Sequence, residues 1–224
     1  GCLAGMQQEV CEKVYRDRIQ RGKEAYSMYK LGAFGSGLGA VACFFETPWS
    51  RVLPALMQDT EAWLLHEAAF HLRALGRLTE AVNPLRAGLE MYVKQKILTG
   101  VITCAINLSE LEQTLGRLDD SVRDAVLSEN YADKSGDALM KNATKTLHAD
   151  ALLQIGREDE AEARFREAEV MQAERQPGLP LLYSLQGFQY CELLLVAPER
   201  AAWKLIQRPE DRRQMTELVE VCYT

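Results

Sequence analysis

Apolar residues recur three or four positions apart along most of the chain, and polar residues occupy the positions between them. The clearest apolar stripes consist of Leu65, Ala68, Ala69, Leu72 and Leu75 and of Leu108, Leu111 and Leu115. This spacing places the apolar side chains on one face of an α-helix. The stripes and the interruptions between them predict six central helices, over residues 59–75, 78–95, 98–115, 118–134, 137–155 and 158–175.

The turn inside each of these helix pairs has the same sequence pattern. Gly76, Gly116 and Gly156 each follow a leucine or isoleucine and precede an arginine, and successive glycines are 40 positions apart. Glycine readily adopts the left-handed conformation that ends a helix, and the acidic residues that come next favour a helix start. A small residue then follows, where two helices can approach closely, at Ala81, Ser121 and Ala161. A constant period of this size indicates stacked repeats, so the sequence predicts an all-α fold, an α-solenoid of stacked antiparallel helix pairs.

The phase of the repeats also divides the chain. Because a solenoid repeat contacts only its neighbours, we expect residues 1–224 to form a single solenoid. Clear repeats are expected at 58–96, 97–136 and 137–178, a degenerate repeat or cap at 1–57, and a degenerate repeat with a capping helix at 179–224.

The flanking segments have weaker patterns. Residues 7–21 and 23–32 predict two amphipathic helices near the start of the chain. Pro180–Val196 and Pro198–Gln207 are expected to form a last helical hairpin, and Pro209–Cys222 a final helix. No segment stands out as a β-strand.

The repeated turn resembles that of tetratricopeptide repeats, in which an apolar residue, glycine, two variable residues, an acidic residue and a small residue follow one another. The common repeat of that family has about 34 residues, and the longer period here resembles its long-helix variety, found in kinesin light chains and bacterial signalling ATPases. HEAT and armadillo repeats have periods of about 40–47 residues, but the recurring turn favours the tetratricopeptide family. The resemblance implies a right-handed solenoid whose concave groove binds a protein or peptide.

Three segments are further similar to the C-terminal repeat region of bacterial STAND-type NTPases, the NACHT and NB-ARC proteins. They are Leu31–Phe34, Phe44–Trp49 and Leu72–Arg77. This resemblance implies the sensor or interaction region of a larger signalling protein, in which ligand binding shifts an equilibrium between inactive and active states. Because the sequence begins with Gly1 and not with methionine, we expect part of a longer chain.

The resemblance also implies which residues line the groove, because the first helix of each pair does so in tetratricopeptide repeats. Carried over by phase from each glycine, the expected lining is Trp63, His66, Phe70, Arg73, Thr103, Ile106, Glu110, Gln113, Thr146, Asp150, Tyr183, Gln186 and Tyr190. Aromatic and arginine side chains are typical of interaction hot spots. The basic clamp of chaperone-binding relatives is matched by Arg73 alone, so a chaperone tail is not the expected ligand. The alternative is that Trp63, Phe70 and Tyr190 belong to the core between repeats.

Composition narrows the possible partners. The 224 residues include 32 acidic and 26 basic side chains, for a net charge of −6, and no basic stripe indicates nucleic-acid binding. No apolar run approaches the roughly 18 residues of a membrane helix, so no membrane partner is expected. The six cysteines are scattered without a Cys-x-x-Cys pair, which favours reduced thiols, a cytoplasmic location and no metal or other cofactor.

Motifs that could carry catalysis are incomplete. His66 and His71 are five positions apart, whereas a zinc protease needs two histidines four apart on one helix face; we expect them to point in different directions, and Glu67 is spaced to pair with His71. Gly35–Gly39 lacks the lysine and serine or threonine of a phosphate-binding loop and predicts a turn leading into a closely packed helix. The isolated His148 is expected in the core or the groove.

The paired acids Asp119–Asp120 and Glu158–Glu160 follow Gly116 and Gly156 at the same repeat phase, which indicates helix starts and not an acid–base or cation site. The sequence therefore predicts a protein that is not an enzyme and that binds a protein or peptide. A self-association scaffold and a receptor for a small molecule or short peptide remain as alternatives.

Overall fold

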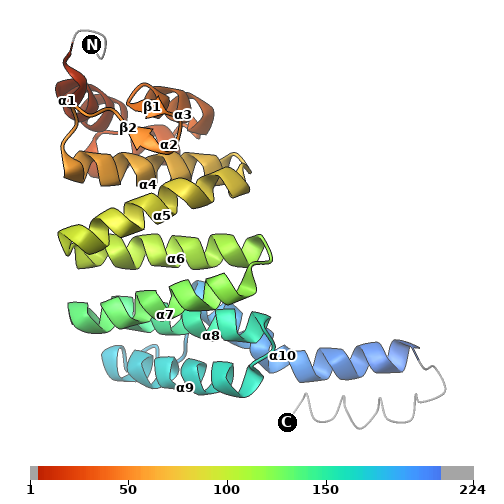
Figure 1. The fold of residues 1–224 in the computed structure, drawn as a ribbon. Helices are drawn as coiled ribbons and strands as arrows, with labels where there is room; N and C mark the ends of the chain where they lie inside the picture. Colours follow the sequence, from red (N-terminus) through yellow and green to blue (C-terminus); the bar gives the residue numbers. More distant parts are fainter. Residues whose placement is uncertain (1–4, 208–224) are drawn as a thin grey trace. The chain divides into compact units, whose positions relative to one another are not determined.

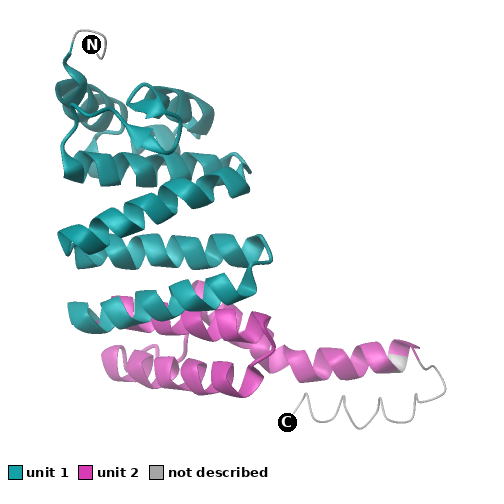
Figure 2. Ribbon diagram, viewed as in Figure 1, with its two compact units in different colours: residues 1–137 teal, residues 138–224 magenta. Residues whose placement is uncertain are grey.

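The computed structural model describes residues 5–207, with the exception of the side chain of Leu205. The predicted helix over Pro209–Cys222 lies outside the described residues. The chain divides into two compact units, Gly1–Asp137 and Ala138–Thr224 (Figure 2). Within residues 5–207, all regular structure apart from one short hairpin is helical. The predicted all-α helical repeat fold is thereby confirmed.

Four helices form the larger part of the first unit, and each packs against the next (Figure 1). They are α4 (Gln58–Ala74), α5 (Leu78–Gln95), α6 (Leu98–Thr114) and α7 (Leu118–Ser135). The described part of the second unit consists of α8 (Ala138–Gln154), α9 (Glu158–Arg175) and α10 (Ser184–Gln207). Helix α10 packs on both α8 and α9. The first six of these helices match the six predicted ones to within one residue at each end.

The three repeated turns have the predicted conformation. Gly76, Gly116 and Gly156 are left-handed, with φ of 73°, 72° and 81°. The arginine after each glycine donates its backbone N–H to a carbonyl five residues earlier, at distances of 2.8 to 2.9 Å, which satisfies a carbonyl left open at the helix end. The small residues of the pattern are fully buried, with 0% exposure at Ala81, Ser121 and Ala161.

The apolar stripes pack into two clusters in the first unit. One lies among α4 to α7 and includes Leu72, Leu85 and Leu108, each at most 1% exposed. The other joins α4 to the N-terminal segment through Val41 and Phe44. The N-terminal segment therefore covers the side of α4 that a preceding repeat would cover in a longer stack.

The N-terminal segment is less regular than predicted. It consists of α1 (Gln7–Glu9), η2 (Val10–Ile19), η3 (Gly22–Glu24), α2 (Tyr26–Tyr29) and α3 (Phe34–Ala42). The first predicted helix corresponds to α1 and η2, whose hydrogen bonds are mostly of the wider π type. The prediction of one continuous helix over residues 23–32 is wrong, because Ala25 is left-handed, with φ of 43°, and separates η3 from α2.

At Gly35–Gly39 the predicted closely packed helix start is confirmed, since these residues lie inside α3, but the turn comes earlier than predicted, with a left-handed Gly32. Gly37 belongs there for a steric reason. A Cβ atom at this position would lie 2.3 Å from the imidazole of His71 on α4, so only glycine allows the two helices to approach this closely.

The structure contradicts two further predictions. An antiparallel pair of strands, β1 (Phe45–Thr47) and β2 (Arg51–Val52), follows α3, and strands this short leave no alternating pattern in the sequence. The predicted hairpin broken at Pro198 is instead one helix, α10, that continues through the proline. Proline inside a helix removes one N–H donor and crowds the carbonyl four residues earlier, yet α10 is helical on both sides of Pro198.

Candidate functional site

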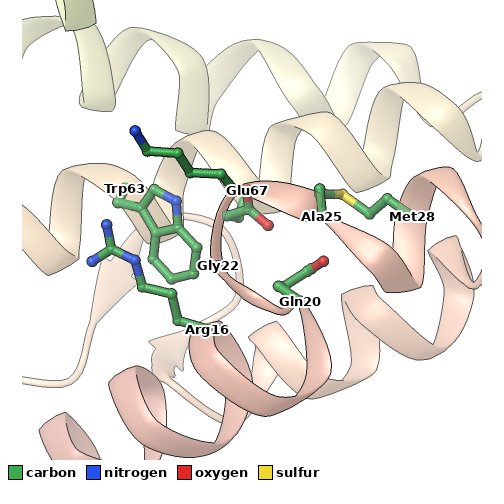
Figure 3. Close-up of a pocket in the computed structure, with 8 residues that line it drawn as sticks. Arg16, Gln20, Gly22, Ala25, Met28, Trp63 and Glu67 are labelled. Carbon is green, nitrogen blue, oxygen red and sulfur yellow. The ribbon is translucent and has the colours of Figure 1, made fainter.

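A pocket of about 300 Å³ opens in the first unit where the N-terminal segment meets α4 (Figure 3). Its lining residues come from η2, from the irregular turns around η3, from α2 and from α4. They are Arg16, Gln20, Gly22, Lys23, Ala25, Met28, Trp63 and Glu67. The volume is at the lower end of the range for small-molecule sites, which is about 300–1,000 Å³.

Glu67 forms part of the floor of this pocket and is only 8% exposed. Burial raises the pKa of its carboxyl group to about 7, against smaller opposing effects from a hydrogen bond with Tyr15 and from the charge of Arg16. Within residues 5–207, no lysine, arginine or histidine forms an ion pair with Glu67. A buried carboxylate without a paired cation is costly, so this side chain is suited to a cationic ligand.

Beneath Glu67, buried polar side chains form a continuous hydrogen-bond network. Gln20 Nε2 donates to Tyr15 Oη at 2.9 Å, and Ser27 Oγ donates to Gln20 Oε1 at 2.8 Å. Tyr15 donates to Glu67 Oε2 at 3.4 Å and lies 3.2 Å from His71 Nε2. Because Tyr15 has a single proton, this arrangement makes His71 a donor through Nε2. Burial lowers the pKa of His71 and raises that of Tyr15, so both are neutral near pH 7.

The rim of the pocket is cationic and aromatic. The guanidinium of Arg16 lies 5.5 Å from the ring centre of Trp63, and the exposed Lys23 lines the opening. The turns beside η3 place Arg21 and Ala25 in the left-handed region, with φ of 55° and 43°. Such conformations cost about 1–3 kcal/mol each in residues with a Cβ and cluster at functional sites.

The predicted groove residues of the first unit lie along α4 and α6. Between residues 62 and 73, the positions that are not buried are the four predicted ones, Trp63, His66, Phe70 and Arg73. Between residues 101 and 113, the positions that are not buried are Thr103, Ile106, Asn107, Glu110 and Gln113. These nine residues, which we call the α4–α6 face, include all eight predicted positions and Asn107, which the phase argument missed because it lies one residue beyond Ile106.

Polar contacts across the α4–α6 face connect the two helices. Arg73 donates through Nη1 to Asn107 Oδ1 and through Nη2 to Glu110 Oε2, the latter at 3.0 Å. Asn107 Nδ2 lies 3.2 Å from His66 Nε2. Burial, and then the charge of Arg73, lower the pKa of His66, so the neutral ring accepts this hydrogen bond. The face therefore presents an ordered row of hydrogen-bonding groups.

The aromatic members of the face also contact the N-terminal segment. The ring centre of Trp63 lies 5.9 Å from that of Tyr15, and Phe70 lies 6.3 Å from Tyr29 and 6.2 Å from Phe34. The rings are therefore packed on one side and half-buried overall, and their place in a binding groove stays a prediction. The two histidines serve different networks, as predicted. Glu67 does not bond directly to His71, and both contact Tyr15.

The predicted groove residues of the second unit are less accessible. Thr146 and Asp150 are buried, at 1% and 5% exposure, and Asp150 accepts a hydrogen bond from Gln189 at 3.2 Å. Tyr190 stacks on Phe165 with ring centres 5.0 Å apart, which is the core packing named as the alternative. Tyr183 and Gln186 remain accessible, as exposed and half-buried residues respectively.

A second buried acidic group lies within the first unit, between α6 and α7. Glu112 and Asp124 are 0% and 2% exposed, and Arg86 of α5 reaches both, donating to Glu112 and lying 3.5 Å from Asp124. Burial, with the neighbouring Asp124, raises the pKa of Glu112. We call these two residues the buried acidic pair.

Comparisons with known proteins add no further assignment. No family model, curated protein or solved structure matches the chain. None of the described helices combines the length and apolar character needed to cross a membrane. Residues 5–207 also contain no cluster of three or more His, Cys, Asp or Glu side chains that could hold a metal ion.

Proposed function

We propose that this chain is a non-catalytic module of the tetratricopeptide type that binds an extended protein or peptide segment on the α4–α6 face. The observation that carries the proposal is the accessible stripe on α4. Between residues 62 and 73, side chains of this helix reach solvent only at the four predicted groove positions, and all the remaining residues are buried. A helix enclosed by its neighbours exposes a stripe of this kind where a partner can contact it.

The chemistry of the face fits a peptide better than a flat apolar partner. Hydrogen-bonding groups in its centre, at Arg73, Asn107 and Glu110, are held in place by one another, so little side-chain entropy is lost when a ligand binds. Trp63 and Phe70 provide partly exposed aromatic contacts at the edge of this row. Ordered polar groups beside aromatic anchors are typical of interaction hot spots.

By its resemblance to STAND-type NTPases, the module would serve as the sensor of a larger bacterial signalling protein. A ligand on the α4–α6 face would then favour the active state by binding it more tightly than the inactive state. This sensor role predicts that the isolated module binds its ligand but does not hydrolyse ATP.

Selection of peptides from a random phage-displayed library, followed by fluorescence anisotropy of the enriched sequences, tests the binding site. Thr103 is exposed in the middle of the face, so Thr103→Arg should block a ligand without removing a packing contact and should weaken binding at least about tenfold. Thr79→Arg, at an exposed threonine near the start of α5, is the matched control and should bind normally. Equal binding by both variants, or no enriched peptide, would contradict the proposal.

Self-association is a second candidate function, and α10 favours it. The side chains along one face of this helix are large, apolar and at least half exposed, namely Leu185, Phe188, Leu195, Trp203 and Ile206. Two exposed glutamates, Glu192 and Glu199, lie among them on this face, and large exposed apolar side chains rimmed by polar ones are typical of protein interaction sites. Light scattering over a wide range of protein concentrations should then show a dimer or larger species that Phe188→Glu with Trp203→Glu dissociates. A monomer at all concentrations would exclude this function.

A further inference from the structure

The pocket at the start of α4 differs from the α4–α6 face in shape, burial and charge. It is a concave space of about 300 Å³, and because a water molecule takes up about 30 Å³ of the liquid, it has room for roughly ten waters. A ligand of that size is a metabolite and not a folded partner. Glu67 and Gln20 both line this space (Figure 3), and both side chains form a hydrogen bond with the Tyr15 hydroxyl.

The floor of the pocket is suited to a ligand group that carries a positive charge and hydrogen-bond donors. Glu67 is 92% buried, which follows from its 8% exposure, and the one hydrogen bond that its carboxylate accepts from a side chain among residues 5–207, from Tyr15, is long at 3.4 Å. Its carboxylate can therefore accept further hydrogen bonds from the pocket side. An ammonium group supplies three donors and the opposite charge, and a charge-assisted bond of this kind is stronger than a neutral one.

The rim of the pocket is suited to a negatively charged group of the same ligand. Arg16 and Lys23 both line the opening, where they would repel a simple cation before it reached Glu67. A ligand with a carboxylate a few ångströms from its ammonium would instead satisfy both ends of the pocket. Trp63 and Met28 also line the pocket and provide apolar surface for a carbon side chain.

We propose that this pocket binds a free α-amino acid, with its ammonium group on Glu67, its carboxylate toward Arg16 and Lys23, and its side chain against Trp63 and Met28. The site is separate from the proposed peptide surface, although Trp63 contributes to both. The two proposals can therefore be tested apart, because Glu67 and Lys23 belong only to the pocket and Thr103 belongs only to the α4–α6 face.

The first test is a thermal-shift screen of the purified chain with each of the twenty amino acids in millimolar excess. A ligand present at about 100 times its dissociation constant should raise the melting temperature by about 5 °C or more. Two derivatives of the amino acid that gives the largest shift serve as controls. The N-acetyl amino acid lacks the ammonium group, and the amino acid amide, which keeps its ammonium group, lacks the carboxylate. Both derivatives should lose most of the shift. If none of the twenty gives a shift, or if the amide binds as tightly as the acid, the proposal is wrong.

Two variants then assign the two ends of the ligand. Glu67→Gln should weaken binding by roughly tenfold to a hundredfold, the range expected for a hydrogen bond to a charged group. Lys23→Gln changes an exposed side chain and should weaken binding of the acid while leaving binding of the amide unchanged. The control, Glu90→Gln, replaces an exposed carboxylate on α5 and should bind normally. If Glu67→Gln binds as tightly as the original chain, the ligand does not contact this carboxylate and the proposal is wrong.

Binding should also depend on pH, because only the ionised carboxylate attracts an ammonium. With a pKa of about 7, the ionised fraction of Glu67 falls roughly tenfold between pH 8 and pH 6, and affinity should fall by the same factor. The other groups that face Glu67 are Tyr15 and Arg16 of η2, His71 of α4 and Tyr92 of α5. Burial raises the pKa of both tyrosines, which stay neutral over this range, and lowers the pKa of His71 below its ordinary value. An affinity independent of pH, or a pH dependence retained in Glu67→Gln, would overturn the assignment.

Discussion

Replacing Glu67 by glutamine should stabilise the folded protein at high pH. The carboxyl group is held in a site that is 8% exposed, and its pKa rises from 4.5 to about 7 because burial disfavours the charged form. Glutamine has nearly the same shape, can still accept the hydrogen bond from Tyr15, and carries no charge. The substitution therefore removes the cost of ionisation and leaves the packing intact.

The size of the effect follows from proton linkage. One pH unit between the folded and unfolded pKa values corresponds to about 1.4 kcal/mol, so a rise from 4.5 to about 7 gives a limit of about 3 kcal/mol. Because the folded-state pKa is the higher of the two, the unfolded chain loses its proton first and stability falls as pH rises. The penalty is absent well below pH 4.5, is about 1 kcal/mol at pH 5 and is complete above about pH 8.

Circular dichroism melting of the original chain and of Glu67→Gln between pH 5 and pH 8 measures this difference. The advantage of Glu67→Gln should grow by about 2 kcal/mol across the range, which corresponds to about 4 to 8 °C in melting temperature. Other titrating groups act equally on both proteins and cancel in the comparison. Glu90→Gln, on the exposed side of α5, should show no such trend. If the advantage is independent of pH or shrinks as pH rises, the reasoning from burial is refuted.

Four more substitutions test the packing by thermal or urea unfolding. Gly37→Ala places a Cβ 2.3 Å from the His71 ring and should lower stability by about 1–3 kcal/mol. Gly39 lies in the same helix, but a Cβ there would meet no atom within 4 Å, so Gly39→Ala should raise stability by up to about 1 kcal/mol. Equal effects of the two variants would contradict the close approach of α3 and α4. Gly116→Ala, at φ of 72°, should cost about 1–2 kcal/mol, and a neutral result would show that the turn relaxes. Arg86→Met removes the cation that contacts both members of the buried acidic pair and leaves, among residues 5–207, only Arg123, 3.8 Å from Asp124. It should cost about 3 kcal/mol at pH 8 but less at pH 5, so a loss independent of pH would contradict the role of charge.

The repeat helices could be predicted from the sequence because their signals are local. The left-handed turn glycines and the apolar stripe of a helix each depend on residues within a few positions of one another. The accessible positions of α4 could also be predicted, by stepping back from Gly76 three or four residues at a time. A helix that is enclosed on its other sides exposes residues at this spacing. The accessible residue Asn107 was missed only because the predicted template took one position per turn.

The pocket could not be predicted in the same way, because its residues are distant in sequence. Tyr15 meets Glu67 and His71 across more than 50 positions, and no period connects them. The turns that shape the opening depend on left-handed residues other than glycine, Arg21 and Ala25, whose sequence gives no sign of that conformation. The helix through Pro198 could not be predicted for a similar reason. The local rule that proline ends a helix predicted a break there, but α10 is continuous and packs on α8 and α9, which are distant in sequence.

The composition of the N-terminal cap supports a role for the pocket beyond covering α4. A cap needs only apolar side chains, and Val41 and Phe44 provide them over part of the contact. Beside them, Tyr15, Gln20 and His71 are at least 98% buried, as their exposures of 2% or less show. Replacing a buried polar network by well-packed apolar residues is often neutral or stabilising, so stability alone does not require this network. Its hydrogen bonds fix the position of Tyr15 beside the Glu67 carboxylate, which is the arrangement that a ligand with an ammonium group needs.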